Sequence, residues 1–303
     1  MKLSDLKCVN KGVDIDKYIV FREMVKKNME HPDWLGDFSK EDLINLLDNG
    51  AVIWVYYEDL EPVCSMMLIP SSMKAMQKFE LDLDYRDVVD YGSMFVNPRY
   101  VGNGLQYQML CELDDYCKNN GFKFAAGTIH PDNVYSINNL VKDDFKMVGT
   151  KEFSRGIRNI YLRCLKDGYI QKIFSFITNG DKYLLLKGSD TDPQFHESFW
   201  YVVTGSIEKE DISLEDGVRR EIFEETALKV LETKRLPIIF KYESLGDYCI
   251  EHVFISKVLD GDIVLNEESI DYKWCSYDEF VDKIKWYGDK NELKLLLTKY
   301  KLK

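Results

Sequence analysis

Residues 199–208 read FWYVVTGSIE and residues 213–228 read SLEDGVRREIFEETAL, and these two segments decide the fold of the C-terminal half. The first segment predicts a strand that ends at a glycine turn. Ser213, with Asp216 three residues later, is a capping-box pair, so the second segment predicts a helix that begins near Leu214. The expected order is therefore strand, turn, loop and helix.

The predicted helix carries three closely spaced glutamates, Glu221, Glu224 and Glu225. Their spacing brings the carboxylates to one patch of the helix, where like charges repel one another. Arg220 lies four residues before Glu224 and can pair with it, which still leaves an excess of negative charge. Magnesium prefers carboxylate oxygens and substrate phosphates as ligands, so a divalent cation would relieve the repulsion. A solvated acidic helix face is the alternative interpretation.

The order of residues resembles a known signature. Gly205, an acidic loop and then Arg-Glu-Ile-Phe-Glu-Glu over 220–225 resemble the Nudix box of hydrolases that cleave a nucleoside diphosphate linked to another group. The loop after Gly205 is one residue longer than in that pattern, so either Glu210 or Asp211 takes the first acidic position. Ala227 stands where the pattern ends in glycine, which makes a sharp turn at the helix end less favourable.

The resemblance implies a site for Mg²⁺ or Mn²⁺ and a role for each acid. The expected metal ligands are Glu208, Glu221, Glu224 and Glu225, and the expected catalytic residues are Glu221, Arg220 and Glu268. Glu221 is either a further ligand or the base that orients water, and Arg220 holds a glutamate in place. Glu268 matches a late acidic position, for which Glu267 competes. An ordinary surface carboxylate is the alternative for Glu268.

Aromatic residues around the predicted site narrow the resemblance to one branch of these hydrolases. Phe199-Trp200 and Tyr272-Lys273-Trp274 look like the dihydroneopterin triphosphate and dATP pyrophosphohydrolases, over about residues 169–303. This similarity implies a nucleoside or pterin triphosphate as substrate, cleaved to a monophosphate and pyrophosphate. Core packing is the competing explanation, because Trp and Tyr in strands usually pack.

A second informative segment lies in the N-terminal half. Gly102-Asn103-Gly104 opens a predicted helix after a strand expected over 90–98, and backbone N–H groups at such a turn form an anion site. Strand, glycine turn, helix, strand, Asn133 and helix in this order resemble a GNAT-type N-acetyltransferase, over roughly residues 10–165. The resemblance implies that Gly102, Asn103, Gly104 and Asn133 bind acetyl-CoA. A helix cap explains Asn133 equally well.

Other positions depart from the acetyltransferase pattern. Val101 replaces the basic residue before the first glycine, and Gln106 replaces a later glycine or alanine. Leu140 stands where many members carry the tyrosine that protonates the departing thiolate. These departures weaken the expectation of acetyl transfer more than the expectation of the acetyltransferase fold.

The segment Lys166-Asp167-Gly168 separates two sets of predicted strands and marks the expected domain boundary. We expect an α/β (α+β) protein of two domains. Residues 1–166 would form a GNAT-like mixed sheet with flanking helices, and residues 167–303 a Nudix α/β/α sandwich. Strands of the second domain are expected at 169–178, 183–187, 237–242, 249–258 and 270–274, with helices at about 277–286 and 289–302.

Charge and cysteine usage exclude several classes of function. The 303 residues carry a net charge of −12, which disfavours a nucleic-acid polymer or an anionic membrane as partner but allows a single nucleotide. The seven cysteines are scattered without paired CxxC motifs, so neither disulfides nor zinc are expected. No signal peptide or membrane span is evident, and a cytoplasmic location fits. His196 and His252 are isolated and are expected to be structural or surface residues.

Three functions fit these patterns. The leading one is a Mg²⁺-dependent pyrophosphohydrolase of nucleoside or pterin triphosphates, with an acetyl-CoA-binding-like N-terminal domain. The second is an active N-acetyltransferase with an accessory Nudix domain. The third is a nucleotide-binding sensor, which the glutamate cluster disfavours because a pure binder does not need it.

Overall fold

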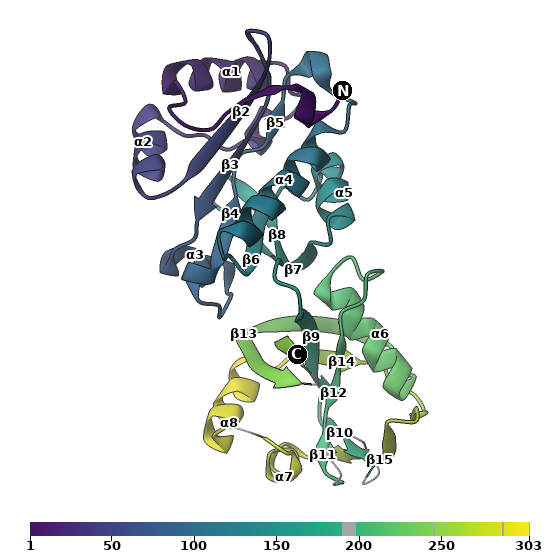
Figure 1. Ribbon diagram of the computed structural model, residues 1–303. Coiled ribbons are helices and arrows are strands. Elements are labelled where there is room, and N and C mark those ends of the chain that lie inside the picture. Colours follow the sequence, from purple (N-terminus) through teal and green to yellow (C-terminus); the bar gives the residue numbers. More distant parts are fainter. Residues whose placement is uncertain (190–197, 245, 287, 303) are drawn as a thin grey trace. The chain divides into compact units, whose positions relative to one another are not determined.

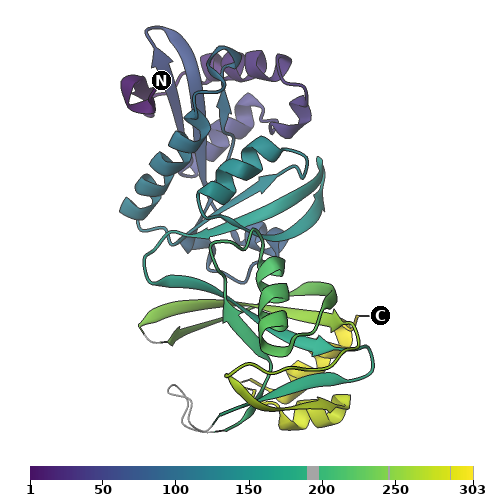
Figure 2. The ribbon, with the colours of Figure 1, turned by 90° about the vertical axis from the view of Figure 1, so that its right-hand side faces the viewer.

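The computed structural model describes residues 1–189, 198–244, 246–286 and 288–302. The chain separates into two compact units, Met1–Asp167 and Gly168–Lys303, and each contains one mixed sheet with flanking helices (Figures 1 and 2). This architecture confirms the predicted mixed α/β class. Within the described ranges, no helix is both long enough and apolar enough to cross a membrane.

The first unit is built on an eight-stranded sheet with the order β1-β2-β3-β4-β6-β8-β7, and β5 pairs with β3. Strands β4 and β6 run parallel, and the other pairs are antiparallel. The strands are β1 (Lys7–Val9), β2 (Val52–Glu58), β3 (Glu61–Pro70), β4 (Val88–Tyr91), β5 (Phe95–Val96), β6 (Phe124–Ile129), β7 (Lys146–Phe153) and β8 (Gly156–Cys164). The helices are α1 (Ile15–Lys27), α2 (Lys40–Asp48), α3 (Met73–Phe79), α4 (Leu105–Asn119) and α5 (Val134–Lys142), with 3-10 turns at Leu3–Asp5, Pro32–Trp34, Tyr85–Asp87 and Pro98–Tyr100.

Alternation along β2 explains how helices cover both faces of this sheet. Ile53 and Val55 belong to the apolar cluster of α1 and α2. Trp54 and Tyr56 point to the other face and join the cluster that contains α4 and Leu140 of α5. The predicted capping box of Ser39 and Asp42 is present at the start of α2.

The strand expected over 90–98 is divided into β4 and β5. The Gly92 backbone N–H donates to Met67 O at 2.8 Å, outside the regular ladder, and pairing with β3 resumes only at Phe95. Strand β4 continues toward β6 whereas β5 pairs with β3 alone, so the two pieces have different neighbours. A sequence pattern of period two does not register such a break.

The second unit contains a seven-stranded sheet with the order β11-β10-β9-β14-β13, where β12 pairs with β9 and β15 with β10. Strands β9 and β14 are parallel. The strands are β9 (Tyr169–Thr178), β10 (Tyr183–Gly188), β11 (Trp200–Tyr201), β12 (Val203–Ser206), β13 (Val230–Ser244), β14 (Asp247–Val258) and β15 (Ser269–Cys275). The helices are α6 (Leu214–Thr226), α7 (Tyr277–Lys283) and α8 (Lys290–Lys299).

Helices cover opposite faces of the second sheet, as Figure 1 shows for α6 on one side and α7 and α8 on the other. Val218 and Ile222 of α6 are fully buried, and α6 packs on β9, β12 and β13. Phe176 and Val253 point to the other face and pack with Phe280 of α7 and with α8. The unit is therefore the α/β/α sandwich that the sequence predicts.

Strand β13 is much longer than the expected segment, which began at Pro237. It starts at Val230 and keeps pairing with β14 through an irregularity between Arg235 and Ile239. Proline lacks a backbone donor and is tolerated at such an irregularity, so it does not end the strand. His196 lies outside the described residues, and His252 is buried in β14 with Nε2 3.1 Å from Gln171 Oε1.

Candidate active site

The capping box predicted for Ser213 and Asp216 begins α6. Ser213 Oγ accepts from the Asp216 backbone N–H at 3.1 Å, and Asp216 Oδ2 accepts from the Ser213 backbone N–H at 2.8 Å. The helix ends at Ala227, which adopts the left-handed conformation with φ +59°. Alanine thus makes the turn that the pattern assigns to glycine, in a conformation unfavourable for a residue with a Cβ.

Two glycines let α6 approach the strand and loop that precede it. A Cβ added at Gly205 would lie 2.0 Å from Glu221 Cδ, so the Glu221 carboxylate packs directly on the backbone of β12. A Cβ at Gly217 would lie 2.4 Å from Ile207 Cδ1. Any larger residue at position 205 would have to displace the Glu221 side chain.

Arg220 is the cation at the centre of the acidic cluster. Its Nη1 donates to Glu221 Oε1 at 2.8 Å and to Glu224 Oε2 at 3.1 Å. Its Nη2 donates to Asp211 Oδ2 at 2.9 Å and to the Ser206 carbonyl at 2.8 Å. The predicted role of Arg220 in holding a glutamate extends here to two glutamates and an aspartate.

Asp211, and not Glu210, binds the arginine. The Asp211 side chain is buried and also accepts a hydrogen bond from the Glu208 backbone N–H at 2.9 Å, whereas Glu210 is exposed. The hydrogen bond from Asp211 is the largest cause that raises the pKa of Arg220 above its usual value, with Glu221 adding to it. Asp211 therefore fixes the guanidinium group in position.

Glu225 is the most unusual carboxylate of the cluster. The residue is 1% exposed, and neither side-chain oxygen makes a hydrogen bond of normal geometry to the described residues. Burial raises its pKa well above the usual value, and the charges of Glu268 and Glu221 raise it further, while the Thr204 backbone opposes them. A buried carboxylate in this condition lacks a compensating positive charge.

The other acids surround Glu225 at the end of β12. Burial raises the pKa of Glu221, Arg220 opposes this, and the charges of Glu224 and Glu268 reinforce it. Glu268 precedes β15 and is exposed, and its charge acts on both Glu221 and Glu225. Glu208 lies 3.8 Å from the Arg220 guanidinium group. The fold thus brings the five predicted acids from α6, from the loop before it and from the β15 end to one region.

The cluster fits a cation in one respect and is closed to it in another. The buried Glu225 carboxylate has the unmet need for positive charge that a divalent ion would satisfy. Among the described residues, no three Asp, Glu, His or Cys side chains stand in ligating geometry together. Arg220 occupies the space between Glu221 and Glu224, so ligand binding requires these side chains to turn away from it.

The predicted acetyl-CoA residues lie at the starts of α4 and α5. Gly102 and Gly104 have φ of +89° and +67°, and an added Cβ would meet no protein atom within 4 Å at either. Asn103 Nδ2 donates to the Tyr100 carbonyl at 3.0 Å. Asn133 Oδ1 accepts from the Ser136 backbone N–H at 3.2 Å, so Asn133 caps α5 as the alternative interpretation proposed.

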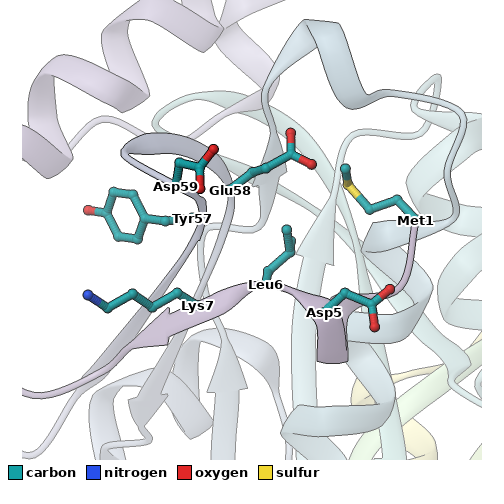
Figure 3. A pocket seen from close by; sticks show the side chains of 7 residues that line it. All are labelled: Met1, Asp5, Leu6, Lys7, Tyr57, Glu58 and Asp59. Atoms are coloured by element: carbon teal, nitrogen blue, oxygen red, sulfur yellow. The ribbon is translucent and has the colours of Figure 1, made fainter.

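A cavity of about 610 Å³ adjoins this glycine turn through Met1, whose amino group lies 3.5 Å from Asn103 Oδ1. Its lining residues are Met1, Asp5, Leu6, Lys7, Tyr57, Glu58 and Asp59 (Figure 3). Three of these seven side chains are acidic and one is basic. This charge balance disfavours a bound pyrophosphate group.

Comparison with known proteins shows which family the second unit resembles. Residues 169–296 match the family model of the NUDIX domain. Among solved structures, the chain is similar to a MutT protein from Methanosarcina mazei Go1, with 24% identity, TM-score 0.37, and coverage of 44% of this chain and 96% of that one. It is also similar to an N-acetyltransferase from Staphylococcus aureus Mu50, with 17% identity, TM-score 0.41, and coverage of 53% and 99%. A third is an Ap4A hydrolase from C. elegans, with 19% identity, TM-score 0.34, and coverage of 43% and 94%.

The C-terminal sandwich and its glutamate helix are those of the class of hydrolases that act on phosphoanhydride bonds. More particularly, residues 169–296 are a Nudix domain, as the segment 220–225 predicts. Of the two acids that the sequence leaves open for the first acidic position, Asp211 is the one that binds Arg220.

Proposed function

We propose that the C-terminal unit is a Mg²⁺- or Mn²⁺-dependent pyrophosphohydrolase that converts a nucleoside or pterin triphosphate to the monophosphate and pyrophosphate. The observation that supports it best is Glu225, a buried carboxylate beside Glu221 and Glu268 whose oxygens make no hydrogen bond of normal geometry to the described residues. Water attacks the α-phosphorus and gives its proton to a carboxylate of the site. The bond from the α-phosphorus to the bridging oxygen breaks, and the pyrophosphate leaves with that oxygen and its electron pair. The excess of acids at one point suits a reaction that binds metal and phosphate together.

The residues divide into ligands and positioning groups. Glu208, Glu224 and Glu225 would hold the metal ion, which would supply charge neutralisation and a positioned water. Arg220 orients Glu221 and Glu224 through its two hydrogen bonds. Glu221 and Glu268 are the two carboxylates left to orient or deprotonate the attacking water.

The direct test is pyrophosphate release from a panel of nucleoside and pterin triphosphates, with and without Mg²⁺. Turnover should require the metal and fall by orders of magnitude in Glu224→Gln and in Glu225→Gln. Glu232→Gln, an exposed acid on β13, is the matched control and should keep wild-type turnover. Undiminished turnover in both site variants would remove the assignment.

A second candidate function belongs to the N-terminal unit. The backbone around Gly102 and Gly104 is open, and it precedes the N-terminus of α4, where an anion such as the pyrophosphate of acetyl-CoA could bind. Calorimetry with acetyl-CoA tests this, and binding that is lost in Gly104→Trp would support it. No binding at millimolar ligand would remove it, in agreement with the acidic cavity beside the turn.

A further inference from the structure

The face of the second sheet opposite α6, on which α7 and α8 pack, also carries a row of polar and aromatic side chains. Ser206 of β12 pairs with Lys172 of β9, Lys172 with Glu251 of β14, and Glu251 with Phe240 of β13. Paired residues point to the same face, so these four side chains form one row across four strands. Glu251 is an acid on a mostly buried part of β14, and the proposed hydrolysis does not use it.

Three half-buried aromatic rings lie beside this row. The Phe174 and Phe240 ring centroids are 5.5 Å apart, Phe240 and Trp286 are 5.4 Å apart, and Phe174 and Trp286 are 6.0 Å apart. All three residues keep part of their surface exposed, unlike the fully buried Phe176 behind them. Exposed aromatic surface of this kind is the usual platform for a planar heterocycle.

Glu251 has spare capacity to accept hydrogen bonds. It is 6% exposed, and the Tyr242 hydroxyl donates to its Oε1 at 3.1 Å. Burial raises the pKa of Glu251 to about 7, while Tyr242 and the charge of Lys172 act against this. A carboxylate can accept about four hydrogen bonds, and the single partner found among the described residues leaves most of that capacity to a ligand.

We propose that this face binds the base of the substrate, and that Glu251 selects a 2-amino-4-oxopyrimidine ring, the ring shared by guanine and pterin. This inference rests on the proposed triphosphatase function. The ring presents a ring N–H and an adjacent amino group on one edge, and a carboxylate accepts from both. Adenine and cytosine offer an acceptor in place of the ring N–H, which a carboxylate repels.

The phosphate site and the base site meet at the end of β12. Gly205 faces α6 and lies under Glu221, whereas its neighbour Ser206 faces Lys172 on the opposite side. A linear triphosphate that passes this strand end reaches the acids with its phosphates while its base lies on the aromatic rings. Lys172, which pairs with Ser206 at this strand end, is a cation available to the sugar or phosphate part of the ligand.

The test compares kcat/KM for GTP, dihydroneopterin triphosphate and ATP in wild type and in Glu251→Gln. We expect wild type to favour the first two, and Glu251→Gln to lose about 10- to 100-fold on them with little change on ATP. The control is Glu243→Gln, an exposed acid on β13, which should match wild type. Equal use of ATP and GTP by wild type, or an equal loss on every substrate in Glu251→Gln, would overturn the inference while leaving the hydrolase intact.

Calorimetry with GMP and AMP gives an answer that does not depend on turnover. Wild type should bind GMP at least tenfold more tightly than AMP, and Glu251→Gln should abolish the difference. If no triphosphate is hydrolysed but GMP is selected, the proposed function fails and the base site stands. If GMP and AMP bind equally or not at all, the base site fails whatever the hydrolytic result.

Discussion

Replacement of Glu225 by glutamine should inactivate the enzyme and stabilise the metal-free protein at the same time. Glu225 is 1% exposed, its carboxyl has no hydrogen-bond partner of normal geometry within the described part of the chain, and it lies near the charges of Glu268 and Glu221. Because burial raises its pKa, ionisation of Glu225 costs more free energy in the folded chain than in the unfolded chain, and this difference lowers stability as pH rises above the usual carboxyl range. Glutamine has nearly the same shape and no charge to lose.

The expected gain follows from the cost of a buried polar group without a partner. That cost is about 1–3 kcal/mol. The glutamine substitution removes the part of this cost that comes from the charge. For a unit of this size the melting temperature should rise by roughly 3–10 °C. Glu224→Gln is the matched variant, because the Glu224 side chain is 52% exposed and its removal should change stability by less than about 0.5 kcal/mol.

Differential scanning calorimetry of the full chain, first with EDTA and then with Mg²⁺, measures both effects. Wild type should gain about 2.7 kcal/mol at a metal concentration one hundred times the dissociation constant, and both variants should lose most of this gain. Pyrophosphate release should be lost in both. If Glu225→Gln destabilises the metal-free protein by 1 kcal/mol or more, the carboxylate is a structural acceptor, for which the Thr204 backbone is the candidate donor, and the reasoning is refuted.

Three further outcomes follow from single residues. Asp211→Asn should lower turnover about 10- to 100-fold, because it loosens the arginine that Asp211 binds. Glu210→Gln, which changes the exposed neighbour, should stay within twofold of wild type. Equal effects of the two variants in a pyrophosphate-release assay would contradict the role of Asp211 in positioning Arg220. Ala227→Gly should raise the free energy of unfolding by roughly 0.5–1 kcal/mol in urea titrations, since φ is +59° there, and a loss would show that the left-handed turn is not formed. Glu251 has a raised pKa, so its contribution to stability should fall as pH rises from about 4.5 to about 7. Glu251→Gln should therefore be more stable than wild type above pH 7 by roughly 1–3 kcal/mol. A stability difference that does not change with pH would show that the pKa of Glu251 is not raised by folding.

Local sequence signals predicted the elements that local chemistry determines. The capping pairs at Ser39 and Ser213 gave the starts of α2 and α6, because a hydroxyl that binds the backbone N–H three residues later acts within one helical turn. Alternation of apolar residues located most strands of both sheets. It did not locate the division between β4 and β5, nor the early start of β13 before Pro237, since both depend on which strand lies alongside.

The arrangement of the site was less predictable than its composition. The sequence names the acids, and only the fold shows that Asp211 is buried against Arg220 while Glu210 is exposed. Two adjacent acids in a loop carry no periodic signal that distinguishes them. Glu251 gave no signal for the same reason, because one acid in an apolar strand becomes informative only when its neighbours on the sheet are known.

The electrostatic balance of the cluster indicates why it suits a reaction more than a stable fold. One guanidinium group, that of Arg220, binds Asp211, Glu221 and Glu224 and also lies 3.8 Å from Glu208. Its single positive charge is therefore already shared among four carboxylates. Glu225 receives none of it and stays buried. A protein that only binds a nucleotide gains nothing from this repulsion. Under the proposed function a hydrolase gains from it, because a cation and the phosphates it carries would complete the site.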